Sequence, residues 1–158
     1  MKVIHTAFLF FVLAVLGCGS DNTFQLGSLE IITGSGVTPD AGEDHLRFDA
    51  TGAITYEQYN QFSDRFASWQ DQLTATEKAH LEDLCDAANV LGQQDISAPA
   101  DPPCLVGGSA IQVLAGSSTG LMNSFTIAGE VLCDPDLIPA GVNALLAEAD
   151  RLKTKYQP

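Results

Sequence analysis

Residues 45–59 read HLRFDATGAITYEQY. Apolar and polar residues alternate on both sides of the central Asp49-Ala50-Thr51-Gly52. Such alternation indicates half-buried β-strands, and an Asp that opens a tight turn ended by Gly suits the chain reversal between them. We therefore predict a β-hairpin with one apolar face. That face carries Leu46, Phe48, Ile54 and Tyr56.

Two amphipathic helices accompany the hairpin. Thr74-Ala75-Thr76-Glu77 has the capping-box order, in which the Thr hydroxyl and the Glu carboxylate each accept from the other residue's backbone amide. We expect Gly92 to end this first helix. Its apolar stripe consists of Leu81, Leu84, Cys85, Ala88 and Leu91. Pro139 suits the first position of the second helix. The stripe of the second helix consists of Ile138, Val142, Leu145, Ala149, Leu152 and Tyr156.

Further strands are predicted over residues 28–33 and in a second hairpin, formed by residues 110–114 and part of residues 121–132. Residues 62–72 are ambiguous. Their apolar residues at 62, 66 and 69 have helical spacing, but the stretch also fits a strand that returns from the first hairpin. The spacing favours a short helix.

These elements predict an α+β fold in a single small domain, with the order ββα-ββα. We expect an antiparallel sheet of about four or five strands, with the two main amphipathic helices on one face. The opposite face of the sheet is then left to contact solvent or a partner.

The N-terminus has the pattern of an export signal. Lys2 precedes an apolar run over residues 7–16, and Gly17 stands directly before Cys18. A run of about ten apolar residues is too short to span a bilayer as a helix, which takes about 20. A charged residue, a short apolar run and a small residue are instead typical of a secretory signal peptide.

The stretch Val15-Leu16-Gly17-Cys18 resembles the lipobox of bacterial lipoproteins. It departs from the commonest pattern at Val15, where Leu is usual, and at Leu16, where a smaller residue is more common. The resemblance implies that the Cys18 thiol carries a diacylglyceryl group and that the signal is cut before it. The alternative is an ordinary secreted protein. Two or three acyl chains anchor a protein stably in a membrane.

On this interpretation the chain has three parts: a signal peptide over residues 1–17, a lipidated tether over 18–27 and a single domain over 28–158. The resemblance places the protein in the bacterial cell envelope, held by lipid on Cys18. In the sorting rule of enteric bacteria, an Asp directly after the lipidated cysteine keeps a lipoprotein in the inner membrane. Gly19 stands at that position here, so we expect the outer membrane or the cell surface.

The charge balance excludes some partners. The chain has 20 acidic and 7 basic residues, with a formal net charge of −13. No basic patch is available to neutralise phosphates, so we expect no nucleic-acid partner. An anionic membrane repels such a domain, and the lipid on Cys18 is therefore expected to supply its membrane contact.

Three cysteines follow Cys18, and an oxidising compartment favours one disulfide and one free thiol. We predict the pair Cys104 and Cys133, because they lie nearly equidistant from the turn of the second hairpin. Cys85 is then a buried free thiol on the stripe of its helix. The alternative is Cys85 with Cys104, since both flank a Pro-rich loop.

No motif predicts catalysis, a metal or a cofactor. His45 and His80 are the two histidines beyond the signal peptide, the spacing of His80 from the cysteines is wrong for zinc, and no G-x-S-x-G occurs. Acidic residues crowd one region without the EF-hand order. They are Asp40, Glu43, Asp44 and Asp49.

We therefore expect a non-enzymatic module that binds a protein or has a structural role in the envelope, inhibitor-like in its small, acidic, disulfide-bonded character. Its partner is expected to bind at the bare face of the sheet or at residues 34–44. The alternative is a small periplasmic hydrolase, in which a pocket gathers His45 or His80 with a Ser and a carboxylate.

Overall fold

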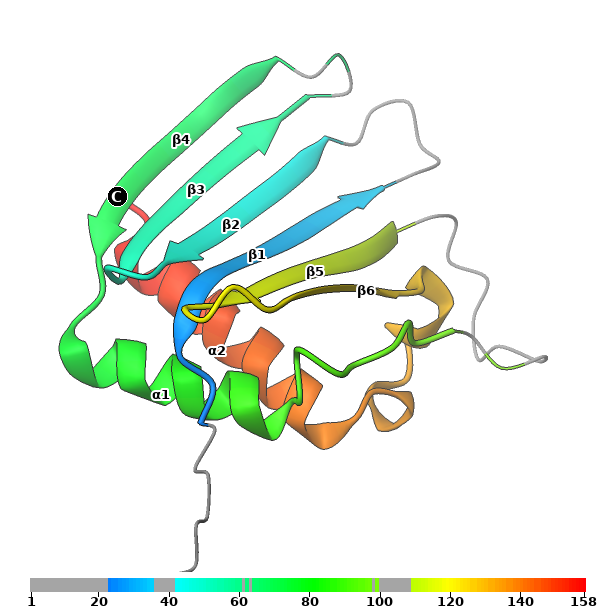
Figure 1. Ribbon diagram of the computed structural model, residues 1–158. Helices are drawn as coiled ribbons and strands as arrows, with labels where there is room; N and C mark the ends of the chain where they lie inside the picture. Colours follow the sequence, from blue (N-terminus) through cyan, green and yellow to red (C-terminus); the bar gives the residue numbers. More distant parts are fainter. Residues whose placement is uncertain (1–22, 36–41, 61, 63, 98, 100–108) are drawn as a thin grey trace, which may run out of the picture.

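The computed structural model describes residues 23–35, 42–60, 62, 64–97, 99 and 109–158. Within them, six antiparallel strands form one sheet in the order β4-β3-β2-β1-β5-β6 (Figure 1). The first half of the chain supplies β1 (Leu26–Ser35), β2 (Glu43–Asp49), β3 (Ala53–Tyr59), β4 (Arg65–Gln72) and α1 (Ala75–Ala87). The second half supplies β5 (Ser109–Ser117), β6 (Met122–Ile127), the 3₁₀ turns η1 (Gly129–Val131) and η2 (Pro135–Leu137), and α2 (Ala140–Tyr156).

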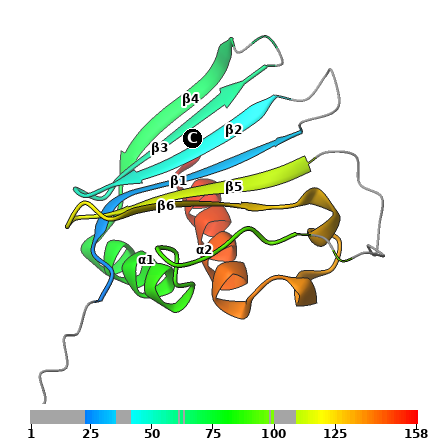
Figure 2. The same cartoon turned by 45° about the vertical axis from the view of Figure 1, so that its right-hand side comes forward.

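Both helices cover the same face of the sheet, as Figure 2 shows. The core lies between this face and the helices, because the strands place alternate side chains on it. On β1, for example, Leu29 lies opposite Phe48 of β2 on one side and Ala115 of β5 on the other. All three side chains are buried. The prediction of an α+β domain with two helices on one face is therefore confirmed.

The first hairpin is confirmed as β2 and β3. The carboxylate of Asp49 accepts hydrogen bonds from the amides of Thr51 and Ala53, and the amide of Gly52 donates to the Asp49 carbonyl. Gly52 has φ +85°, a conformation that costs side-chain-bearing residues about 1–2 kcal/mol. A residue with a Cβ at this position would therefore weaken the turn.

Helix α1 begins as predicted, with the complete capping box of Thr74 and Glu77. The prediction that Gly92 ends it is wrong. The helix ends at Ala87, and Asn89 takes the left-handed conformation with φ 49°. The amide of Val90 donates to the Cys85 carbonyl, which completes a Schellman motif with Asn89 in the place usually taken by Gly.

Helix α2 is confirmed, and its buried stripe packs on the sheet and on α1. Pro139 caps the helix rather than opening it. The buried apolar side chains are Ile138, directly before the cap, and Val142, Leu145, Ala149 and Leu152 within the helix. A Cβ on Gly141 would lie 2.4 Å from the Ala87 carbonyl oxygen, so this glycine lets the start of α2 approach the end of α1.

The expected element order and strand number are wrong, because residues 65–72 form β4 rather than a helix. Across the described residues the order is ββββα-ββα, with six strands. Phe62, one member of the helical spacing, lies in the turn before β4 and is 74% exposed. Trp69 lies opposite Tyr56 of β3 and stacks on its ring, with centroids 5.6 Å apart. Pairing with β3 therefore decides the conformation of this stretch.

The domain begins earlier than the predicted boundary at residue 28. Phe24 and Leu26 are buried in the core, so part of the stretch assigned to the tether is packed in the domain. The predicted signal peptide and Cys18 lie outside the described residues. No helix of the described ranges is long and apolar enough to cross a membrane.

Candidate binding surface

Both helices of the described residues lie on one face of the sheet, and we call the opposite face the open face. Its central feature is a row of interacting polar side chains from β1, β2, β3 and β4, which we call the polar ladder. The polar ladder consists of Glu30, His45, Arg47, Glu57, Tyr59 and Arg65.

Glu57 is the most buried member of the polar ladder, with 9% of its surface exposed. Its carboxylate accepts hydrogen bonds from Arg65, at 2.6 Å, from the Tyr59 hydroxyl, at 2.9 Å, and from Arg47. The hydrogen bonds from Arg65, Tyr59 and Arg47 outweigh the effect of burial and lower the pKa of Glu57 to about 2. Glu57 is therefore a buried anion held by two guanidinium groups.

His45 completes the polar ladder and lies between two carboxylates. Its Nδ1 lies 2.8 Å from a carboxylate oxygen of Glu30 and its Nε2 3.3 Å from one of Glu43. Its ring meets that of Tyr59 edge-on, with centroids 5.0 Å apart. His80 is exposed on α1, which lies on the other side of the sheet. In the described part of the chain, neither imidazole makes a hydrogen bond with a serine.

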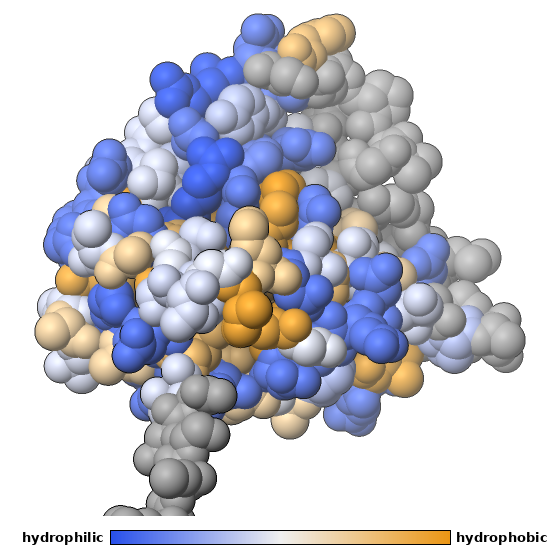
Figure 3. Space-filling view, viewed as in Figure 1, coloured by the Kyte–Doolittle hydropathy of each residue, from blue (hydrophilic) through white to orange (hydrophobic). Residues whose placement is uncertain are grey.

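An apolar area adjoins the polar ladder on the open face. Leu114 of β5 and Met122 of β6 border a shallow hollow of about 360 Å³, which Arg47 and Thr55 line from the other side. Met122 is 78% exposed. Figure 3, which has the viewpoint of Figure 1, shows apolar residues gathered near the middle of the surface between hydrophilic areas. The open face thus combines fixed charges with exposed apolar surface.

A second, smaller cavity of about 210 Å³ lies between the covered face of the sheet and α2. Its walls are mostly apolar, and Asp44, Asp150 and Lys153 stand among its lining residues. Lys153 pairs with Asp44 at 2.9 Å and lies over the ring of Tyr56, 4.5 Å from its centroid. Asp44 and Lys153 are therefore engaged in holding α2 to β2 and β3.

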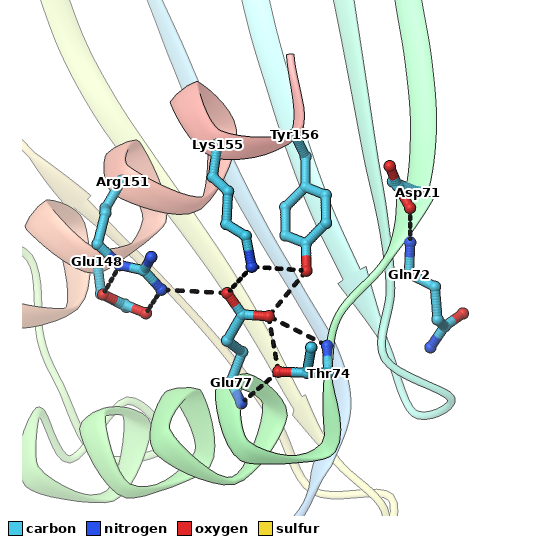
Figure 4. A network of polar contacts seen from close by, with 8 residues as sticks. All are labelled: Asp71, Gln72, Thr74, Glu77, Glu148, Arg151, Lys155 and Tyr156. Atoms are coloured by element: carbon cyan, nitrogen blue, oxygen red, sulfur yellow. Dashed lines mark hydrogen bonds and ion pairs between the residues drawn. The ribbon is translucent and has the colours of Figure 1, made fainter. Parts of the chain in front are cut away.

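Glu77 joins the two helices, as Figure 4 shows. Its carboxylate accepts hydrogen bonds from Lys155 and from the hydroxyls of Tyr156 and Thr74, each at 2.8 Å. Burial opposes its ionisation, but these hydrogen bonds hold the pKa of Glu77 well below its usual range. This network fixes the start of α1 to the end of α2, and its role is structural.

The acidic residues considered as a calcium site do not converge. Asp49 serves the hairpin turn, Asp44 pairs with Lys153, and Glu43 contacts His45. Asp40 lies outside the described residues. Within the described ranges, no group of three or more His, Cys, Asp or Glu side chains is placed to hold a metal ion.

Among the cysteines, Cys85 is a buried free thiol, and burial raises its pKa to about 12. This excludes the alternative pairing of Cys85 with Cys104. Cys104 lies outside the described residues, so the disulfide between Cys104 and Cys133 remains a prediction.

Comparison with known proteins adds no assignment: no protein-family model matches the chain, and no curated protein matches its sequence. The polar ladder was missed by sequence reasoning, although the open face itself was expected. Its members come from four strands, and only the register of the sheet brings them together.

Proposed function

We propose that this protein is a lipid-anchored module of the bacterial cell envelope that binds a protein partner through the open face of its sheet. The observation that carries the proposal is the polar ladder. Its side chains are held by one another before any partner arrives, so they lose little conformational freedom on binding. A preformed, charged and partly apolar surface of this kind suits a specific protein contact.

The shape of the open face favours a protein over a small molecule. Small-molecule sites are concave and bury 70–90% or more of the ligand. The hollow beside Leu114 and Met122 is shallow and opens on the broad surface of the sheet. A partner that lies across several strands can contact the polar ladder together with the side of this hollow that Arg47, Thr55 and Leu114 form.

The charges favour a partner with a basic surface. Every Lys and Arg of the described residues is already paired with a carboxylate of the same chain. They are Arg47, Arg65, Lys78, Arg151, Lys153 and Lys155. The acidic surplus is therefore uncompensated, and complementary potentials speed association and exclude like-charged partners.

The lipid anchor is supported by the resemblance of residues 15–18 to the lipobox. Binding is favoured over the alternative of hydrolysis by the state of His45, because both of its ring nitrogens face carboxylates of the polar ladder and its rim. An imidazole acting as a general base must reach the hydroxyl of a nucleophile.

Site-specific photocrosslinking in intact cells tests the proposal. A photoreactive amino acid replaces Gln112 or Ser68, two exposed positions on the open face, and Ala147 on the exposed side of α2 is the matched control. We expect a discrete protein adduct from Gln112 and Ser68 and none from Ala147. Adducts from Ala147 alone, or no adduct from either open-face position, would overturn the proposal.

A further inference from the structure

The chain enters the domain beside the turn between β5 and β6. The amide of Ser118 donates to the Gln25 carbonyl at 2.9 Å, and the Ser118 hydroxyl donates to the Gln25 side-chain oxygen at 3.1 Å. In Figures 1 and 2 this turn lies next to the start of β1. We call residues 23–25 and 117–122 the entry corner. An anchor on the chain before residue 23 therefore keeps the β5–β6 turn near the anchoring point.

The entry corner exposes two large apolar side chains next to each other. Leu121 is 62% exposed and Met122 is 78% exposed. A hollow of about 410 Å³ adjoins them, lined by Phe24, Leu91 and uncharged polar residues of the entry corner. Exposed apolar clusters of this kind mark contacts with proteins or membranes.

The entry corner is also uncharged, in a strongly acidic chain. Residues 102–129 contain no Asp, Glu, Lys or Arg, and neither do residues 22–29. In the described part of the chain, carboxylates flank the corner on α1, where Glu82 accepts from the Leu26 amide and pairs with Lys78, and Asp86 lines the next hollow. Asp21 precedes the corner in the sequence. A surface without charges is the part of this protein that an anionic membrane repels least.

The length of the tether brings the entry corner to the membrane. Four residues separate Cys18 from Thr23, and the five fully extended Cα–Cα steps between them span at most about 17 Å. The polar headgroup layer of one leaflet is about 5–8 Å thick. If acyl chains on Cys18 lie in the bilayer, the entry corner is confined to its surface, and even a weak apolar contact is favoured at such an effective concentration.

We propose that the entry corner docks on the bilayer that holds the lipid, with Leu121 and Met122 in the headgroup region. This inference rests on the lipid anchor of the proposed function. Docking at the entry corner fixes the orientation of the domain on the membrane. The entry corner lies at the same end of the sheet as the turn between β2 and β3, whereas Glu43, Tyr59 and Arg65 lie at the other end. The polar ladder then extends away from the membrane toward a partner.

Fluorescence quenching on vesicles tests the docking. The full lipidated protein, with Trp69→Phe to remove the native signal, carries Met122→Trp and is reconstituted in phosphatidylethanolamine–phosphatidylglycerol vesicles with brominated acyl chains. The matched control carries Phe62→Trp, which is 74% exposed in the β3–β4 turn at the other end of the sheet. We expect a blue shift and loss of most of the emission for Met122→Trp, and neither change for Phe62→Trp.

Vesicle flotation separates the two ways in which the inference fails. Protein that floats with the vesicles but shows no quenching of Met122→Trp overturns the docking and leaves the lipid anchor standing. Protein that does not float overturns the anchor and the docking together. A blue shift that arises without lipid and grows with protein concentration assigns Leu121 and Met122 to a contact between two copies of this chain, which also overturns the docking.

Discussion

Arg47 Nε donates a 2.8 Å hydrogen bond to Glu30 Oε1, and these two residues lie directly opposite each other on β2 and β1. The same guanidinium reaches Glu57 on β3, which lies diagonally across the next strand pair. Direct and diagonal neighbours of this kind are the contacts through which a sheet is stabilised. One side chain thus links three strands of the open face.

Substitution of Glu57 by Gln removes the buried anion of the polar ladder while keeping its shape. We expect Glu57→Gln to lower the free energy of unfolding at pH 7 by about 1–3 kcal/mol, because two guanidinium groups lose a charged acceptor. Urea unfolding followed by circular dichroism measures this loss.

The loss of unfolding free energy caused by Glu57→Gln should depend on pH. The pKa of Glu57 is lowered from 4.5 to about 2 in the fold, so its stabilisation is fully present above about pH 4.5 and disappears as the pH falls toward 2. We expect the difference between wild type and Glu57→Gln to shrink between pH 7 and pH 3. A difference that stays constant over this range contradicts the buried anion.

Glu77→Ala tests the junction of the two helices. The substitution removes the capping-box carboxylate and the acceptor of Lys155 and Tyr156, and we expect it to lower the unfolding free energy by about 2–3 kcal/mol. Asp83→Ala, at an exposed position of the same helix, is the matched control and should change it by less than about 0.5 kcal/mol. Equal effects of the two substitutions would show that the network adds nothing.

The Schellman motif at the end of α1 predicts which of two substitutions at Asn89 gives the more stable protein. Because Asn89 has φ 49°, Asn89→Gly should retain or raise the melting temperature. Asn89→Ala should cost about 1 kcal/mol more than Asn89→Gly, since alanine pays for the left-handed conformation. Thermal unfolding of the two variants compares them directly, and an alanine variant as stable as the glycine variant would place the helix end elsewhere.

Thiol alkylation tests the assignment of the cysteines. Burial and a pKa raised to about 12 should protect Cys85 from iodoacetamide in the native protein. After denaturation without a reductant, mass spectrometry should find label on Cys85 and none on Cys104 or Cys133. Label on either of the latter two before reduction rules out the predicted disulfide.

Local sequence patterns predicted the elements whose conformation is decided locally. The hairpin turn at Asp49 and Gly52, the capping box at Thr74 and the stripe of α2 each depend on residues close together in sequence. The strand β4 was missed because its conformation depends on pairing with β3. Among its described side chains, Trp69 is the one large aromatic that points toward the helices. The end of α1 was misplaced because Asn89, a weaker signal than Gly92, supplies the left-handed residue.

The candidate surface was predictable only in outline. Two helices on one face imply an open face opposite, and this much followed from the amphipathic stripes. The polar ladder did not, because it requires the register between β1, β2, β3 and β4. Glu30 and Glu57 are distant in sequence, and Arg47 meets both only after the strands align. Likewise, nothing in the sequence indicates that Ser118 contacts Gln25.

Both the envelope location and the docking of the entry corner depend on a lipid anchor on Cys18. Metabolic labelling with an alkyne analogue of palmitate tests it most directly, in wild type, in Cys18→Ser and in the control Cys85→Ser. We expect label in wild type and Cys85→Ser, with a mature chain that begins at residue 18, and none in Cys18→Ser. Label in Cys18→Ser at the level of wild type would contradict the account.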